Sequence, residues 1–230
     1  MSGIKEKITK AFKVDLDSEE NQNILKPSAR PFKAHQVDGV AKKIYKLIKD
    51  ANHSNDDIIL NHNEIKEAFF SPFKPQLKNT QVFLSHSHAD KNKALKVKNY
   101  LESETNHRVF IDSLFWDYKD DVLNELEKYD NTSKIKDAFT LILRESLEDM
   151  IKKCPYFVFL ESKNSVSLNQ DLSRTTYSAW IYEELKIAHS IRESRPIPMM
   201  ESWQVSHNIS PFLESLETIT LKELSRIINS

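Results

Sequence analysis

The sequence predicts an α/β fold in which helices flank a five-stranded parallel sheet. Short apolar runs with the length of buried strands alternate with stretches whose apolar residues recur at helical spacing. Strands and helices in this order imply parallel pairing through right-handed crossovers. The strands are predicted at 81–85, 108–112, 156–160, 196–200 and 218–220. The helices are predicted at 91–101, 119–128, 138–152, 177–193 and 221–228.

The chain before residue 79 is expected to be a helical extension of this fold. Residues 35–51 and 62–70 carry apolar side chains at helical spacing, whereas residues 1–25 are polar and are expected to be poorly ordered. Two helices bury little surface alone, so we expect them to pack on the chain that follows or on a second chain. The predicted domains are a partly disordered N-terminal helical extension over 1–78 and an α/β domain over 79–230.

Glycine content excludes two common classes of nucleotide enzyme. The 230 residues include only two glycines, Gly3 and Gly39. Loops that bind phosphate need glycine so that backbone N–H groups can approach the anion closely. Two distant glycines cannot form a P-loop or a G-x-G-x-x-G motif, which excludes a Walker-type NTPase and a Rossmann dehydrogenase.

Charge and cysteine content indicate the setting of the protein. Lys and Arg number 33 against 34 Asp and Glu, so there is no basic excess to attract a nucleic acid. Cys154 is the one cysteine, which fits a reducing compartment. No run approaches ~18 apolar residues, and the N-terminal sequence lacks a signal-peptide core. We therefore expect a soluble cytoplasmic protein with no nucleic-acid and no membrane partner.

Polar side chains follow the first two strands of the predicted domain. The first strand ends at Ser85 and leads into His86, and the second ends at Asp112 and opens into a loop that carries Trp116. Ligands of open parallel sheets bind outside the carboxyl ends of the strands. A hydroxyl, an imidazole, a carboxylate and an indole together suit a ligand that combines sugar hydroxyls with a flat ring.

Each of these residues also has a simpler interpretation. Ser85 and Asp90 are suited to cap the helix that follows, and Asp112 is suited to bind loop amides. His86 and His88 lack a third metal ligand close in the sequence. The sequence therefore predicts no metal site, and leaves the capping and binding roles open.

Glu184 is the most informative residue of the predicted helix at 177–193. At about 100° per residue, it lies about 40° from Trp180, in the middle of a stripe of apolar residues, whereas Glu183 lies outside that stripe. A buried carboxylate is costly unless it is paired or functional, and burial raises its pKa toward a range useful for acid–base chemistry. A salt bridge to a lysine or arginine of another element is the alternative. Of the two acids, Glu184 is the candidate functional residue.

Three segments resemble a Toll/interleukin-1 receptor (TIR) domain. They are Val82–Asp90, Val109–Asp112 and Ser178–Leu185. Their order and spacing match the first strand, the second strand with its BB loop, and the C helix of that family. The resemblance covers about residues 79–228 and implies a flavodoxin-like fold with a five-stranded parallel sheet. Residues 1–78 lie outside it.

The resemblance also implies an activity and a set of site residues. Many members of the family cleave NAD+ at the nicotinamide–ribose bond with a glutamate four residues after a tryptophan on the C helix. Here these are Glu184, as the catalytic residue, and Trp180. The substrate-binding residues implied for NAD+ are Ser85, His86, Asp112, Trp116 and Trp180. NAD+ is then the substrate, and no cofactor is implied.

By the same resemblance, the protein is similar to stand-alone prokaryotic TIR enzymes of Thoeris-like antiphage systems. This implies an NAD+ glycohydrolase or ADP-ribosyl cyclase whose product activates a separate effector protein, and which forms a homo-oligomer on activation. Two alternatives stay open. One is a non-catalytic TIR scaffold that recruits partners through its BB loop and N-terminal helices, and the other is a deoxyribosyltransferase-like enzyme that acts on nucleosides.

Overall fold

The structure is a computed structural model, and its described residues form two compact units. It describes residues 10–25, 38–50, 52–54, 57–59, 61–70, 79–128, 133–168, 173–193 and 207–230. Unit 1 takes its residues from 1–30, 79–112 and 147–230, and unit 2 takes its residues from 31–78 and 113–146. The chain passes from unit 2 to unit 1 between Lys78 and Asn79, where the sequence predicted a domain boundary. Each unit nevertheless contains residues from both before and after this point.

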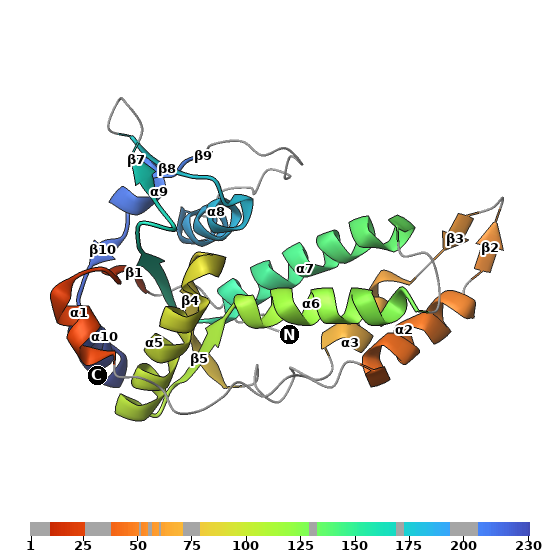
Figure 1. The fold of residues 1–230 in the computed structure, drawn as a ribbon, viewed down its shortest axis with the longest axis horizontal. Coiled ribbons are helices and arrows are strands. Elements are labelled where there is room, and N and C mark those ends of the chain that lie inside the picture. The colour runs from red at the N-terminus through yellow and green to blue at the C-terminus, as the bar shows by residue number, and fades with distance from the viewer. Residues whose placement is uncertain are drawn as a thin grey trace. The chain divides into compact units, whose positions relative to one another are not determined.

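Unit 1 is built on a sheet whose five strands, within the described residues, all run parallel (Figure 1). The strands are β1 (Lys10–Asp15), β4 (Thr80–Ser85), β5 (Arg108–Ile111), β6 (Tyr156–Glu161) and β10 (Glu217–Thr218). Their order in the sheet is β10-β1-β6-β4-β5. The neighbours β5, β4 and β6 repeat the 2-1-3 order with which a flavodoxin-like sheet begins. The predicted α/β class, with a five-stranded parallel sheet and flanking helices, is confirmed.

Strand β1 is a member of this sheet that the sequence did not predict. It pairs with β6 along its whole length, from Lys10 opposite Tyr156 to Asp15 opposite Glu161. The polar character that suggested disorder comes partly from Lys13, whose charge is compensated by Glu161 at 3.3 Å. The expectation of poor order is therefore wrong for residues 10–25, which also include helix α1 (Glu19–Ile24).

The other elements of unit 1 surround the sheet or form a small second sheet. The helical elements are η1 (His88–Asp90), α5 (Lys91–Glu104), the end of α7 (Ser133–Lys153), α8 (Ala179–Glu193), α9 (Ser210–Glu214) and α10 (Leu221–Asn229). The small sheet pairs β7 (Ser167–Leu168), β8 (Arg174–Thr176) and β9 (His207–Asn208) in antiparallel fashion. The predicted strand at 196–200 lies outside the described residues.

Unit 2 is helical and explains how the two N-terminal helices are covered. It contains α2 (Asp38–Lys49), α3 (His62–Phe70), α6 (Ser113–Leu126), the first part of α7, and a hairpin of β2 (Asn52–Ser54) and β3 (Asp57–Ile59). Helix α2 packs on both α3 and α6. The rings of Phe69 and Tyr118 meet edge to face, with their centroids 5.0 Å apart. The predicted helices are confirmed, and they pack on residues that the chain inserts between β5 and β6.

Helix α6 corrects the prediction of a loop after the second strand. The helix begins at Ser113, directly after Asp112, whereas the sequence suggested that it begins at residue 119. The segment contains neither glycine nor proline to stop a helix, and Tyr118 and Val122 are buried one turn apart on one helix face. Trp116 therefore lies on a helix, and not in a loop.

No described helix is both long enough and apolar enough to cross a membrane.

Truncation of a β1 side chain tests whether this strand belongs to the core. Phe12 is 1% exposed, so we expect Phe12→Ala to lower the free energy of unfolding by about 3–5 kcal/mol. Lys10→Ala, at an exposed position of the same strand, is the control and should change it by less than about 0.5 kcal/mol. Denaturant unfolding monitored by circular dichroism measures both. Equal stability of the two variants would mean that β1 does not contribute to the core.

Candidate functional site

The candidate site lies where β4 and β5 end beneath helix α8, and all of it belongs to unit 1. Ser85 is the last residue of β4, His86 follows it, and Asp112 comes directly after β5. Glu184 lies in the second turn of α8. The exposed fractions are 0% for Ser85, 3% for His86, 5% for Asp112 and 0% for Glu184. The site is therefore a polar cluster enclosed by protein.

The local sequence accounts for this placement. The cores of β4 and β5 are apolar and buried, with the rings of Phe83 and Phe110 5.5 Å apart, so the first polar residues appear where the strands end. Helix α8 buries Ile181, Leu185 and Ala188. Glu184 belongs to the same buried surface, and it is carried toward the strand ends by the helical repeat.

The carboxyl group of Glu184 is held in an environment that disfavours its charge. Burial raises its pKa well above the usual value, and the neighbouring Asp112 raises it further. The nearby Ser85 hydroxyl opposes this shift, but neither Glu184 oxygen has a hydrogen-bond partner of normal geometry. Among the described residues no lysine or arginine forms an ion pair with Glu184, so the salt-bridge alternative is not realised there. The structure thus favours a neutral Glu184.

The imidazole of His86 lies beside the carboxyl group of Asp112. Its Nδ1 lies 2.9 Å from Asp112 Oδ1. The approach is short enough for an ion pair, although the ring is not aligned for a regular hydrogen bond. Burial lowers the pKa of His86, but the contact with Asp112, a backbone contact at Leu84 and the charge of Asp90 outweigh it, and the net pKa is raised. The Nε2 atom is buried without a hydrogen-bond partner.

The two adjacent acids of α8 differ in their surroundings and not in their burial. Glu183 and Glu184 are both 0% exposed. Glu183 forms an ion pair with Lys186, at 3.5 Å between Oε2 and Nζ, whereas Glu184 faces Asp112 and Ser85. Glu183 thus has a cationic partner, whereas the neighbours of the Glu184 carboxyl group are an acid and a hydroxyl.

The two tryptophans predicted to bind the substrate lie on different helices, in different units. Trp180 lies on α8 one turn before Glu184 and is partly exposed. Trp116 lies on α6, in unit 2, and its side chain is outside what the structure describes. The predicted binding role of Trp116 stays a prediction, and its predicted position in a loop is wrong.

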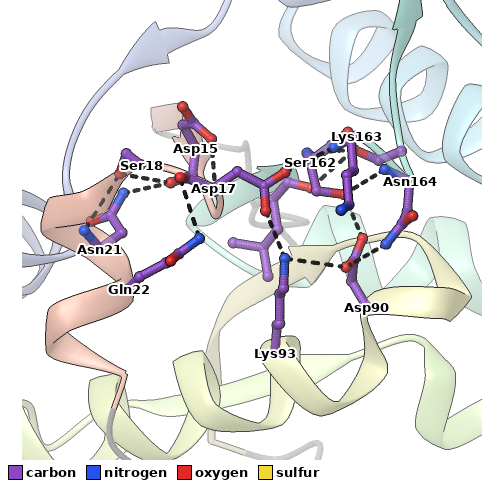
Figure 2. A network of polar contacts seen from close by, with 12 residues as sticks. Asp15, Asp17, Ser18, Asn21, Gln22, Asp90, Lys93, Ser162, Lys163 and Asn164 are labelled. Carbon is purple, nitrogen blue, oxygen red and sulfur yellow. Dashed lines mark hydrogen bonds and ion pairs between the residues drawn. The ribbon is translucent and has the colours of Figure 1, made fainter.

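Asp90 is a buried acid whose partners the sequence interpretation missed. It occupies the N-cap position of α5, but its side chain makes no capping hydrogen bond. Figure 2 shows that it instead accepts hydrogen bonds from Ser162 Oγ at 2.5 Å and from Asn164 Nδ2 at 2.9 Å, both from the segment after β6. A signal for this was present, because polar residues directly follow β6 and a 2-1-3 strand order makes β6 the neighbour of β4.

Within the described part of the chain, no group of three or more His, Cys, Asp or Glu is arranged to hold a metal ion. No protein-family model, no curated protein and no solved structure matches the sequence. The chemistry of the site therefore has to be inferred from its own residues.

The raised pKa of Glu184 predicts how stability depends on pH. Above the ordinary pKa of 4.5, the unfolded chain releases this proton before the folded protein does. The free energy of unfolding therefore falls as the pH rises toward the folded-state pKa. Glu184→Gln removes this decrease in the free energy of unfolding, because glutamine does not titrate. We expect the variant to be more stable than the wild type at pH 8, on the order of 1–3 kcal/mol, and the difference to shrink near pH 5.

Thermal or denaturant unfolding from pH 5 to pH 8 measures this effect. Glu183→Gln is the matched control, because it changes an equally buried acid that has a lysine partner, and it should be destabilised at pH 8. A Glu184→Gln protein less stable than the wild type across the whole range would mean that the carboxyl group is charged and compensated in the folded state.

Proposed function

We propose that this protein is a TIR-domain enzyme that cleaves the bond between nicotinamide and ribose in NAD+. The observation that supports it best is the cluster around Glu184, which follows Trp180 by one turn and faces the ends of β4 and β5. Both Glu184 oxygens, Ser85 Oγ and His86 Nε2 are buried without hydrogen-bond partners. Unsatisfied buried polar groups are rare in folded proteins, and they are typical of sites that act on a ligand.

The proposed reaction suits a carboxylate in this position. When the C1′–N bond breaks, its electron pair leaves with nicotinamide, which departs as a neutral molecule, and positive charge develops on the ribose. An ionised Glu184 beside the ribose stabilises this oxocarbenium-like state. The pyridinium charge of bound NAD+ lowers the pKa of Glu184, because an opposite charge favours the ionised form. The substrate itself thus supplies the condition for an ionised Glu184.

The neighbouring residues have complementary roles in this proposal. Ser85 and Asp112 offer hydrogen-bonding groups to the ribose hydroxyls, and His86 balances the charge of Asp112. Trp180 offers a flat surface for one of the rings. Attack by water on the ribose carbon gives ADP-ribose and a proton, and attack by a nitrogen of the adenine gives a cyclic product.

The burial of the cluster bears on activation. Because Ser85 and Glu184 are 0% exposed, a dinucleotide reaches them only after the elements that cover them move. This fits an enzyme that is activated by forming a homo-oligomer, as the resemblance to TIR proteins implies. In the full proposal the product is a nucleotide signal for a separate effector in antiphage defence.

One observation favours a second function. In the same structure, none of the four polar groups of the cluster is open to solvent. This favours a non-catalytic TIR scaffold, in which the cluster has only a structural role and partners are bound elsewhere.

Turnover assays separate these functions. We expect the assembled wild-type protein to release nicotinamide from NAD+, and Glu184→Gln to reduce kcat by roughly 10²–10³-fold, because the variant loses a charge that acts in the transition state. Glu183→Gln tests the adjacent buried acid and should keep most of the activity. Trp180→Ala should mainly raise KM. Mass spectrometry of the products measures all four proteins.

A panel of substrates completes the test. Absence of turnover in every assembly condition would contradict the enzyme and favour the scaffold. Cleavage of nucleosides in preference to NAD+ would indicate the deoxyribosyltransferase-like alternative. Equal rates for the wild type and Glu184→Gln would remove Glu184 from the mechanism.

A further inference from the structure

A polar network joins three segments that follow different strands of the sheet (Figure 2). Its centre is Asp90, which is 2% exposed and receives hydrogen bonds from Ser162 Oγ and Asn164 Nδ2. Lys93 Nζ lies 3.8 Å from Asp90 Oδ1. We call Asp90, Lys93, Ser162 and Asn164 the Asp90 cluster. It connects the segment after β4 to the segment after β6, which is the neighbour of β4 in the sheet.

The Asp90 cluster is close in sequence to the candidate site. His86 precedes Asp90 by four residues, and the chain between them forms η1, in which the Asp90 N–H donates to the Ser87 carbonyl at 2.8 Å. Ser87 is also buried. At one end this segment is fixed by β4, and at the other by the contacts of Asp90. Little freedom is left for His86 between two fixed ends.

We propose that Asp90 is a positioning residue, which holds His86 against Asp112 and beside Glu184 by tying the segment after β4 to the segment after β6. The part of this inference that concerns activity rests on the proposed function. The part that concerns His86 does not, because it is a property of the folded protein alone.

Asp90 also acts on His86 through its charge. The acidic groups around the imidazole are Asp112, from the end of β5, and Asp90, from η1, and Asp112 is in turn next to Glu184 of α8. Burial lowers the pKa of His86, and Asp112 and Asp90 raise it, with Asp112 the stronger. Removal of the Asp90 charge should therefore lower the pH at which His86 titrates.

An outer part of the network provides a matched control. Asp17, from the turn after β1, accepts a hydrogen bond from Lys93 Nζ at 2.7 Å and another from the Lys163 N–H at 3.0 Å. About a third of the side chain is exposed for both Asp17 and Lys93, so solvent weakens their ion pair. Asp17→Asn changes an acid of the same network that does not touch Asp90 or His86.

The test is an NMR titration of the histidine rings in the full-length protein, with His86→Gln used to assign the resonance. In Asp90→Asn we expect His86 to titrate at lower pH than in the wild type. In Asp17→Asn we expect His86 to titrate as in the wild type. An unchanged His86 titration in folded Asp90→Asn would overturn the proposal and leave Asp90 with a purely structural role.

A second variant, Asn164→Ala, and the NAD+ assay complete the test of the positioning role. If Asp90→Asn does not fold, Asn164→Ala removes one tether and keeps the acid, and it should shift the His86 titration in the same direction; no shift would overturn the proposal. In the NAD+ assay, kcat of Asp90→Asn should fall on the order of 10–100-fold through misplacement of the site. A wild type without turnover would count against the proposed function only, because the His86 titration in Asn164→Ala, which keeps the Asp90 charge, decides the positioning role by itself.

Discussion

The central constraint in this structure is the burial of the Glu184 carboxyl group opposite Asp112. Two acids that meet away from water cannot both carry a charge at low cost, so one of them holds a proton or gains a cationic partner. Here the contact with Asp112 raises the pKa of His86 and so favours its cationic form, and burial favours the neutral form of Glu184. Because folding raises the pKa of Glu184, we expect this group to contribute less stability as the pH rises above 4.5. On the same helix α8, the equally buried Glu183 has Lys186 as an ion-pair partner.

The fold positions this cluster through the order of its strands. Because β4 lies between β5 and β6, the segments that follow all three strands gather at one edge of the sheet. One side of the β4 end holds Asp112 and Glu184, and the other side is closed by Asp90 with Ser162 and Asn164. His86 contacts Asp112 of the first set and precedes Asp90 of the second by four residues, so we expect its position to depend on both.

Much of this could be predicted from the sequence, because apolar periodicity reports burial directly. It predicted β4, β5, β6 and α8 and the burial of Glu184, but it wrongly placed Glu183 outside the buried face, because Glu183 is also 0% exposed and has Lys186 as its partner. It failed where a tertiary contact decides the structure. Strand β1 contains Lys13, which is tolerated only because Glu161 is next to it, and the role of Asp90 depends on residues more than 70 positions away. The predicted start of α6 is wrong because a loop was expected after the second strand, although residues 113–118 contain no glycine or proline to prevent a helix.

The most direct test of this account is a ¹³C NMR titration of the glutamate carboxyl groups, with and without a non-cleavable NAD+ analogue. Glu184→Gln identifies the resonance. The account predicts that Glu184 titrates well above the ordinary 4.5 in the free protein, and at a lower pH once the cationic analogue is bound. A Glu184 that titrates near 4.5 in the free protein, or that does not respond to the analogue, would contradict it.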